Sequence, residues 1–201
     1  MMAFPGDTSR QPSTKGMLAR EIERKSVHVA AMAIPLGCRF LPRYIMMPIL
    51  LGASVVMLCI EYARLENRRF ANVFSRFFGS VVREHESFTF TGSTFVLTGS
   101  LCTYYLYDRH IAAAALSFLI LGDSAAAIVG KAFGSYRLFG KSFEGFTANV
   151  VVSWLIGIAF VSPWLAAYGA VTAAIVEFLP IPLDDNLRIP LVAGAVMTLL
   201  S

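Results

Sequence analysis

Long apolar runs alternate with short polar segments along most of the 201-residue chain. Seven of these runs are predicted to be helices that cross a membrane, because charged residues, proline or glycine bound them. They cover about residues 17–41, 44–62, 89–107, 110–130, 146–161, 165–179 and 189–201. Several runs are shorter than the roughly 20 residues that a helix perpendicular to the bilayer needs, so the predicted boundaries are approximate.

The segment after the second run has a different pattern. Apolar residues from Phe70 to Val82 recur every three or four positions, as they do on one face of a helix. The opposite face carries four arginines: Arg68, Arg69, Arg76 and Arg83. A helix of this kind lies in the headgroup layer of a membrane, where its arginines meet lipid phosphates.

These patterns predict an all-α fold, a polytopic membrane helical bundle of about seven transmembrane helices plus one interfacial amphipathic helix. Residues 17–201 form a single transmembrane catalytic domain in this prediction, because the loops are too short to hold a second domain. Residues 1–16 are rich in Pro, Ser, Thr and Gly and are predicted to be a disordered cytoplasmic tail.

The composition favours a membrane protein over a soluble one. Hydrophobic residues make up 56% of the chain and charged residues 15%, and the mean hydropathy is +0.64, which is more apolar than a soluble domain. The net charge of +4 comes from loop lysines and arginines, so it indicates anionic lipid headgroups and no nucleic-acid partner. The three cysteines form no CxxC pair and predict neither a zinc site nor a disulfide framework.

The basic residues sort to one side of the predicted spans. With the N-terminus cytoplasmic and the C-terminus outside, all 17 lysines and arginines except Arg39, Arg43 and Arg109 are cytoplasmic, as the positive-inside rule requires. The same assignment places most other polar segments on that side: Glu21 to His28, Glu61 to Arg68, Thr91 to Thr94, Asp123 to Lys131, Gly140 to Gly145 and Asp184 to Asn186. We infer a single site at the cytoplasmic interface.

The segment GDSAAAIVGKAFG, residues 122–134, is informative because it begins within an apolar run. Asp123, Ala127, Gly130 and Gly134 recur at three- and four-residue spacing, so they share one face of a helix. Carboxylates within membrane segments are costly and usually functional, although a buried polar residue that joins two helices is the simpler alternative. With the lysines of this segment and of GKSFEG, residues 140–145, the pattern indicates phosphate and metal chemistry. It contains no GxxxxGK[ST] motif of a P-loop.

Two further groups of polar residues stand at the starts of predicted helices. The entry to the first span carries charged residues and a histidine on one face: Glu21, Arg24, Lys25 and His28. The start of the third span carries hydroxyl residues where free backbone N–H groups would face an anion: Thr91, Ser93 and Thr94. Plain helix capping explains this second group equally well.

The ERKxxH entry, GDSAAAIVGKAFG, GKSFEG and the late E…DDNLRIP together resemble the CTP-dependent polyprenol kinase family, which includes dolichol kinase, phytol kinase and the CTP-using diacylglycerol kinase. The resemblance covers about residues 21–191, and phosphatidate cytidylyltransferase is similar more distantly. It implies a membrane enzyme that uses CTP and Mg²⁺ to phosphorylate a lipid alcohol. The chain departs from the family at Phe143, where relatives usually have leucine, and at Phe146, where they have a small residue.

Phosphoryl transfer from a nucleotide requires charge neutralisation and positioning of the reactants. Carboxylates supply hard oxygen ligands for Mg²⁺, and those predicted are Asp123, Glu144, Asp184 and Asp185. Basic, hydroxyl and glycine residues are predicted to contact the nucleotide: Arg24, Lys25, Thr91, Ser93, Thr94, Gly130, Lys131, Gly134, Gly140, Lys141, Ser142 and Gly145. The predicted catalytic residues are Asp123 as the base for the lipid hydroxyl, His28 as the reserve base, and Lys141.

Two other activities stay open at this point. A cytidylyltransferase would attack the alpha phosphate of CTP and release pyrophosphate, whereas a kinase attacks the gamma phosphate and releases CDP. An ion-coupled transporter could use Asp123 and Glu177 along an ion path, although the polar residues gather on one side and no inverted repeat is visible. The residues also leave open the acceptor lipid, the nucleotide preference and whether the chain forms a homodimer.

Overall fold

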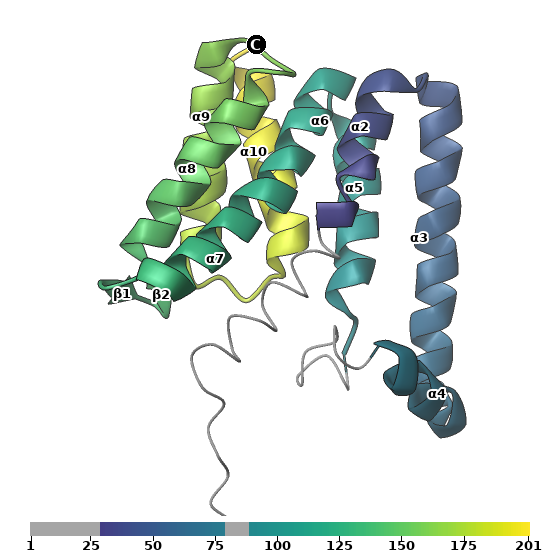
Figure 1. The fold of residues 1–201 in the computed structure, drawn as a ribbon. Coiled ribbons are helices and arrows are strands. Elements are labelled where there is room, and N and C mark those ends of the chain that lie inside the picture. Colours follow the sequence, from purple (N-terminus) through teal and green to yellow (C-terminus); the bar gives the residue numbers. More distant parts are fainter. Residues whose placement is uncertain (1–28, 79–88) are drawn as a thin grey trace, which may run out of the picture.

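The computed structural model describes residues 29–78 and 89–201, and its helices run side by side as a bundle (Figure 1). They are α2 (Ala33–Phe40), α3 (Arg43–Glu66), α4 (Arg68–Phe78), α5 (Gly92–Leu106), α6 (Arg109–Ser117), α7 (Asp123–Phe133), α8 (Phe143–Gly157), α9 (Pro163–Phe178) and α10 (Asp185–Leu199). A π-helical turn, η2 (Phe118–Gly122), joins α6 to α7. An antiparallel hairpin of two short strands, β1 (Arg137–Leu138) and β2 (Lys141–Ser142), joins α7 to α8. The predicted helical fold is confirmed, and the hairpin was not predicted.

The predicted apolar runs correspond to helices whose ends differ from the prediction by a few residues. The described part of the first run contains α2, whereas the predicted tail and the entry residues up to His28 lie outside the described residues. Helix α10 begins at Asp185, earlier than the predicted 189, because Asp184 caps it. The Asp184 side chain accepts a hydrogen bond from the Asn186 N–H at 2.9 Å, which satisfies one of the unpaired donors at the helix start.

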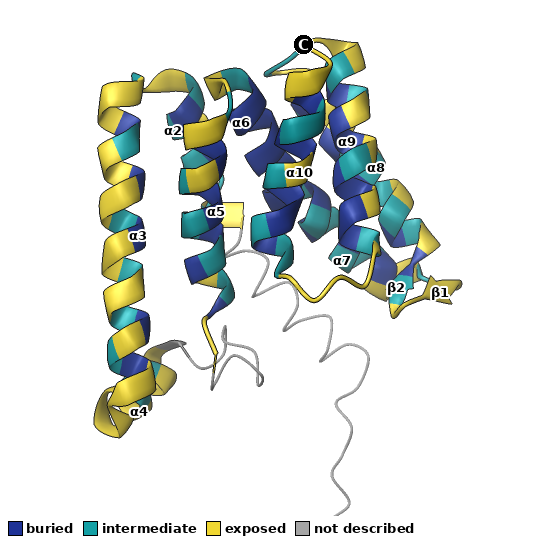
Figure 2. Ribbon diagram, turned by 180° about the vertical axis from the view of Figure 1, so that it is seen from behind, coloured by how far each residue is buried: buried dark blue, intermediate teal, exposed yellow. Residues whose placement is uncertain are grey.

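The centre of the bundle is the continuous helical segment formed by α6, η2 and α7. Every residue from Ala112 to Ile120 is completely buried, and Figure 2 shows this segment in the colour of buried residues. Helices α2, α5 and α10 pack against α6, and α8 packs against η2 and α7. The run of alanines from Ala112 to Ala115 carries little side-chain bulk, so neighbouring helices come close.

Two described helical segments are long and apolar enough to cross a membrane, namely α3 and residues 109–133. Helix α3 packs mainly against α5 at the edge of the bundle and exposes much of its apolar surface (Figure 2). The exposed side chains include Ile49, Leu51, Val55 and Val56. Helices α8 and α9 are also apolar but shorter. The lengths of the helices therefore do not establish the predicted number of seven transmembrane spans.

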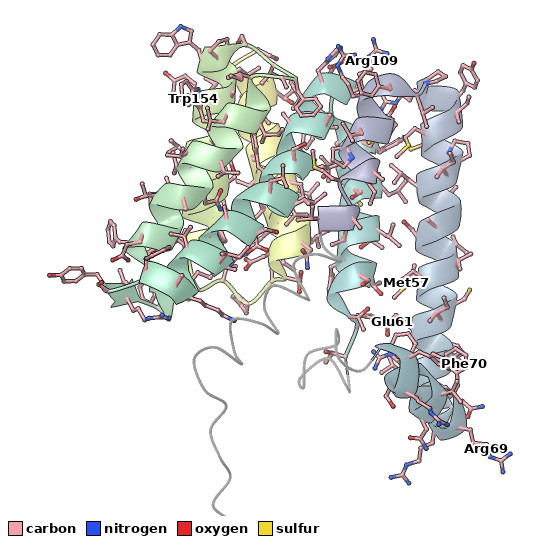
Figure 3. The ribbon with its side chains drawn as sticks, viewed as in Figure 1. Met57, Glu61, Arg69, Phe70, Arg109 and Trp154 are labelled. Carbon is pink, nitrogen blue, oxygen red and sulfur yellow. The ribbon has the colours of Figure 1, made fainter. Side chains whose placement is uncertain are left out.

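The described part of the predicted amphipathic helix forms α4, whereas Val82 and Arg83 at its predicted end lie outside the described residues. Its apolar side chains Phe70, Val73 and Phe77 are exposed, and Figure 3 shows Arg69 and Phe70 on this helix at the end of α3. The ring of Phe74 lies under the guanidinium of Arg64 on α3, with 5.7 Å between the guanidinium carbon and the ring centroid. This cation–π contact fixes α4 to the end of α3.

The polar segments of the described residues converge at one end of the bundle (Figure 1). The end of α3, the start of α5, the hairpin and the link between α9 and α10 all lie there, whereas Arg109 and Trp154 lie at the opposite end (Figure 3). This arrangement brings together most of the segments that the sequence analysis assigned to the cytoplasmic side.

Candidate active site

Asp123 follows directly after the π-helical turn η2 in the middle of the bundle. Such turns are rare in helices and are frequent at functional sites. Gly122, the last residue of the turn, lies against α8 so closely that a Cβ atom there would clash with the side chains of Asn149 and Ser153. A glycine at this position therefore lets α8 approach the helix that carries Asp123.

Three glycines of the two predicted phosphate-binding segments serve close packing around Ser142. A Cβ atom at Gly130 would lie 2.8 Å from Ser142 Oγ, one at Gly134 would lie 2.7 Å from Ser142 Cβ, and one at Gly145 would lie 2.7 Å from the Ala126 carbonyl oxygen. Ser142 caps α8, since its Oγ accepts a hydrogen bond from the Gly145 N–H at 3.0 Å. The nearest atoms to these glycines are therefore the protein's own, and their predicted nucleotide contacts stay a prediction.

Gly140 differs from the other glycines of these segments. It has a φ of +80°, and a Cβ atom built on it would meet nothing within 4 Å. Its conformation suits glycine, and its surroundings leave room for a ligand to approach the backbone. Among the glycines predicted to contact the nucleotide, Gly140 therefore has open surroundings, and its contact stays a prediction.

Lys141, on β2, links the hairpin to both α9 and α10. Its Nζ donates a hydrogen bond to the Glu177 backbone carbonyl, lies 3.5 Å from Glu177 Oε1 and lies 3.2 Å from Asp185 Oδ2. A third of its side chain is exposed. The ammonium group is thus held between two carboxylates and is still accessible from outside.

The link between α9 and α10 is fixed by Arg188. Its guanidinium donates a 2.7 Å hydrogen bond to Asp185 Oδ1 through Nε and a 3.0 Å hydrogen bond to the Leu179 carbonyl through one terminal nitrogen. The other terminal nitrogen also pairs with Asp185 Oδ1. Arg188 is buried, so this ion pair sets the position of Asp185 relative to the end of α9.

Glu177 lies in the last turn of α9 and is buried, with a polar or charged neighbour near each of its carboxylate oxygens. Its Oε2 accepts a 2.5 Å hydrogen bond from Asn149 Nδ2 of α8. Asn149 Oδ1 in turn accepts a 2.8 Å hydrogen bond from Ser153 Oγ. Asp123 and Asp185 both act electrostatically on Glu177, as does Lys141.

We call Asp123, Lys141, Asn149, Glu177, Asp185 and Arg188 the Glu177 cluster. The contacts above join the last five, and Asp123 acts electrostatically on Glu177. In the part of the chain that the structure describes, the cluster brings three carboxylates together with two cations. It draws on α7, β2, α8, α9 and α10 and lies at the polar end of an otherwise apolar bundle. Such an arrangement can hold a charged ligand and accept a proton.

The other predicted metal ligands lie at the edge of this cluster. Glu144 Oε1 accepts a 2.9 Å hydrogen bond from the Ser135 N–H, while its Oε2 is buried and has no hydrogen-bond partner among the described residues. Asp184 caps α10. Within residues 29–78 and 89–201, no group of three or more His, Cys, Asp or Glu side chains is arranged to hold a metal ion. The predicted Mg²⁺ ligands therefore stay a prediction.

Of the other basic residues predicted to contact the nucleotide, only Lys131 lies within the described residues. Lys131 is exposed in the last turn of α7, on the same helix as Asp123. Arg24, Lys25 and His28 lie outside the described residues. Their predicted roles, the reserve base among them, are not tested by the structure.

Thr91 and Thr94, predicted to contact the nucleotide, face a carboxylate of the protein itself. Glu61 is completely buried, and its Oε1 accepts hydrogen bonds from the Thr91 N–H at 2.9 Å, from Thr94 Oγ1 at 3.0 Å and from the Thr91 hydroxyl. Its Oε2 pairs with Arg64 at 2.5 Å, and Arg64 also donates a 2.5 Å hydrogen bond to the Thr89 carbonyl. We call this group the Glu61 cluster, and it joins α3 to the start of α5. Glu61 is therefore an anion that this helix start faces, and Ser93 makes no such contact with the described residues. The predicted nucleotide contacts of these three residues stay a prediction.

Three phenylalanines form an aromatic cluster beside the Glu177 cluster. Phe143 and Phe146 of α8 and Phe178 of α9 have ring centroids 5.6 to 6.3 Å apart. Phe143 is more than half exposed, and Phe178 directly follows Glu177. These rings bring an apolar surface next to the charged groups.

Sequence reasoning did not predict Asn149 or Arg188 as site residues. It included Glu177 in the motif E…DDNLRIP and in the alternative transporter but gave it no role in the kinase. The available signal was that Asn149 and Glu177 carry an amide and a carboxylate inside apolar runs, where polar groups are costly and usually functional. Their pairing could not be predicted, because they lie 28 positions apart.

Comparison with known proteins identifies relatives of the whole chain. The chain is 28% identical to an uncharacterized protein of Rickettsia prowazekii over 186 residues, which cover 85% of this chain and 90% of the relative. It is 24% identical to CTP-dependent diacylglycerol kinase 1 of Schizosaccharomyces pombe over 204 residues, which cover 90% of this chain and 93% of the relative.

A third relative matches a shorter part of the chain. Farnesol kinase from the chloroplast of Arabidopsis thaliana is 32% identical over 115 residues, which cover 47% of this chain and 37% of the relative. No family model and no solved structure matches the chain. The relatives with a stated activity are kinases of lipid alcohols, as the motifs predicted. Over much of its length the chain is therefore similar to CTP-dependent kinases of lipid alcohols.

Proposed function

We propose that this protein is a membrane-embedded kinase that transfers the gamma phosphate of CTP to the hydroxyl group of a lipid alcohol. The observation that carries the proposal is the Glu177 cluster, in which carboxylates and cations from four elements, with an amide from a fifth, meet at the polar end of an apolar bundle. The relatives named diacylglycerol kinase and farnesol kinase support the same reaction class. A polyprenol, a phytol-like alcohol or a diacylglycerol is the proposed acceptor.

The hairpin is proposed to bind the triphosphate. Lys141 is partly exposed and has carboxylate partners, so a phosphate group can compete for its ammonium without a large movement of the hairpin. Gly140 leaves space beside it for the ligand. Lys131 and Arg137, both exposed near this loop, add positive charge for a ligand that carries several negative charges.

The oxygen-rich donor set fits Mg²⁺, which prefers carboxylates and phosphate oxygens and keeps several waters. Asp123 would hold the ion together with the phosphates, and the Glu144 Oε2 atom that has no hydrogen-bond partner among the described residues is a second donor. When bound, Mg²⁺ neutralises charge on the phosphate groups. A cation also suits the Glu177 cluster, because its carboxylates outnumber its cations.

The lipid is proposed to reach the cluster from the surface of α8 and α9. Both helices expose apolar side chains, among them Val151, Leu155, Val171 and Ile175, and the aromatic cluster lies at the polar end of this surface. A chain lying against these helices would bring its hydroxyl group next to Glu177 and Lys141.

The experiment that tests the proposed function compares two labels. The purified protein is incubated with extracted membrane lipids and CTP labelled at either the gamma or the alpha phosphate, and the lipids are separated by thin-layer chromatography. The kinase predicts label in the lipid from gamma-labelled CTP alone. Label from alpha-labelled CTP would indicate a cytidylyltransferase, and no label from either would contradict both enzymes and favour the ion-coupled transporter.

A further inference from the structure

Glu177 is the buried carboxylate of the site that the proposed roles leave unused. It lies in the last turn of α9 with its side chain 9% exposed. Of its two carboxylate oxygens, Oε2 accepts the hydrogen bond from Asn149. Oε1 accepts none from the described residues, and its charged neighbour Lys141 Nζ lies 3.5 Å away, beyond the usual length of a hydrogen bond.

A chain of hydrogen bonds holds Glu177 in a fixed orientation. Ser153 Oγ donates to Asn149 Oδ1 at 2.8 Å, which directs the amide Nδ2 of Asn149 to Glu177 Oε2 at 2.5 Å. Asn149 and Ser153 are completely buried, and Gly122 packs directly against both. A base oriented by a second group, which is itself oriented by a third, is the arrangement found in sites that activate a hydroxyl.

The other carboxylates of the site are suited to different tasks. Asp185 already pairs with Arg188 and with Lys141. Glu144 accepts a backbone hydrogen bond beside the hairpin, and Asp123 is proposed to bind the metal. Glu177 is the carboxylate whose neighbour in sequence, Phe178, belongs to the aromatic cluster at the apolar surface.

We propose that Glu177 is the catalytic base that accepts the proton of the lipid hydroxyl. In this step, the hydroxyl oxygen forms a bond to the gamma phosphorus, and the bond from that phosphorus to the bridging oxygen of CDP breaks. The hydroxyl proton moves to Glu177 Oε1, and CDP leaves with the electron pair. This inference rests on the proposed function and replaces the base predicted from the sequence, Asp123. Asn149 is a positioning residue that acts through Glu177.

The test uses the full-length protein in detergent micelles with gamma-labelled CTP and a farnesol or diacylglycerol acceptor that the wild type phosphorylates. Glu177→Gln keeps the shape of the side chain and an oxygen for the Asn149 amide but cannot accept the proton. It is expected to slow single-turnover transfer on the order of 10²- to 10⁴-fold and to leave the Kd for CTP unchanged. Glu177→Asp is expected to transfer faster than Glu177→Gln, because it keeps the carboxylate.

Two further variants sharpen the result. Asn149→Ala is expected to slow transfer on the order of 10²-fold or less, since it removes only the orientation of the base. Glu66→Gln, the same change at an exposed residue of α3, is the matched control and is expected to behave as the wild type.

The proposal is overturned if Glu177→Gln transfers phosphate at the wild-type rate or as fast as Glu177→Asp. It is equally overturned if Glu177→Gln weakens CTP binding while the rate at saturating CTP is unchanged, because Glu177 would then only hold Lys141. If Glu177→Gln does not fold, the comparison of Glu177→Asp with the wild type decides, and an unchanged rate overturns the proposal. Absence of gamma-label transfer by the wild type would instead contradict the proposed function.

Discussion

Glu61→Gln should destabilise the protein strongly although it changes a single oxygen to an amide group. Glu61 and Arg64 have side chains 0% and 5% exposed and approach to 2.5 Å, so the substitution removes the Glu61 carboxylate from a buried guanidinium. Removing one partner of a buried ion pair costs about 3–5 kcal/mol. The substitution also weakens the hydrogen bonds from Thr91 and Thr94 to Glu61 Oε1. Since domains are stable by about 5–15 kcal/mol, the variant is expected to fold with much of its stability lost.

A double-mutant cycle separates the ion pair from other effects. Arg64→Met should cost a similar amount, because it leaves the carboxylate of Glu61 buried without its cation. The double variant Glu61→Gln/Arg64→Met should cost less than the sum of the two single variants by about 0.5–3 kcal/mol, as expected for residues in contact. Unfolding in detergent micelles by increasing sodium dodecyl sulfate, followed by far-ultraviolet circular dichroism, measures all three free energies.

The result also tests the assignment of the start of α5. If Glu61 is the anion that Thr91 and Thr94 bind, Glu61→Gln lowers the stability and leaves the KM for CTP unchanged. The buried ion pair would be refuted if the losses of unfolding free energy in the two single variants added up to the loss in the double variant. It would also be refuted if each single variant lost less than about 1 kcal/mol. A large rise in the KM for CTP would instead return these threonines to the nucleotide site.

Three further predictions concern the site. Asp123→Asn should reduce turnover by several orders of magnitude with an unchanged helical content by circular dichroism, and near-normal kcat would leave Asp123 a packing role only. Lys141→Ala should raise the KM for CTP strongly and the KM for the lipid little. The control Arg76→Ala, on the exposed face of α4, should leave the KM for CTP unchanged. If both variants have the same KM for CTP, the hairpin is not part of the nucleotide site. Phe146→Ala, which opens the aromatic cluster, should change the KM for the lipid and not the KM for CTP. Trp164→Ala, at the other end of the bundle, should change neither KM. If the two variants change the KM for the lipid equally, the lipid binds elsewhere.

The helices could be predicted from the sequence because each apolar run must be shielded from water and must form the hydrogen bonds of its own backbone. The convergence of Lys141 and Asp185 at one end of the bundle was predicted from charge alone. The π-helical turn was not, because the run from Phe118 to Gly122 is apolar like its neighbours and only the packing of α8 on Gly122 distinguishes it.

The site was predicted less completely than the fold, for physical reasons. Gly130 and Gly145 were interpreted as positions where the backbone comes close to a phosphate, and the close neighbours that the structure shows there are Ser142 and the Ala126 carbonyl. The start of α5 was expected to face an external anion, and Glu61 lies there, 30 positions earlier in the chain. A glycine or a helix start reveals that something comes close, but the identity of the neighbour depends on contacts distant in sequence.

The most direct test of the proposed function is the mass of the lipid product. The wild-type protein is incubated with CTP, Mg²⁺ and one purified lipid alcohol, and the lipid and nucleotide products are identified by mass spectrometry, with Asp123→Asn as the inactive control. A lipid kinase predicts that the alcohol gains one phosphoryl group and that CDP appears in equal amount. A lipid that gains a cytidylyl group with release of pyrophosphate, or an unmodified lipid with intact CTP, would contradict it.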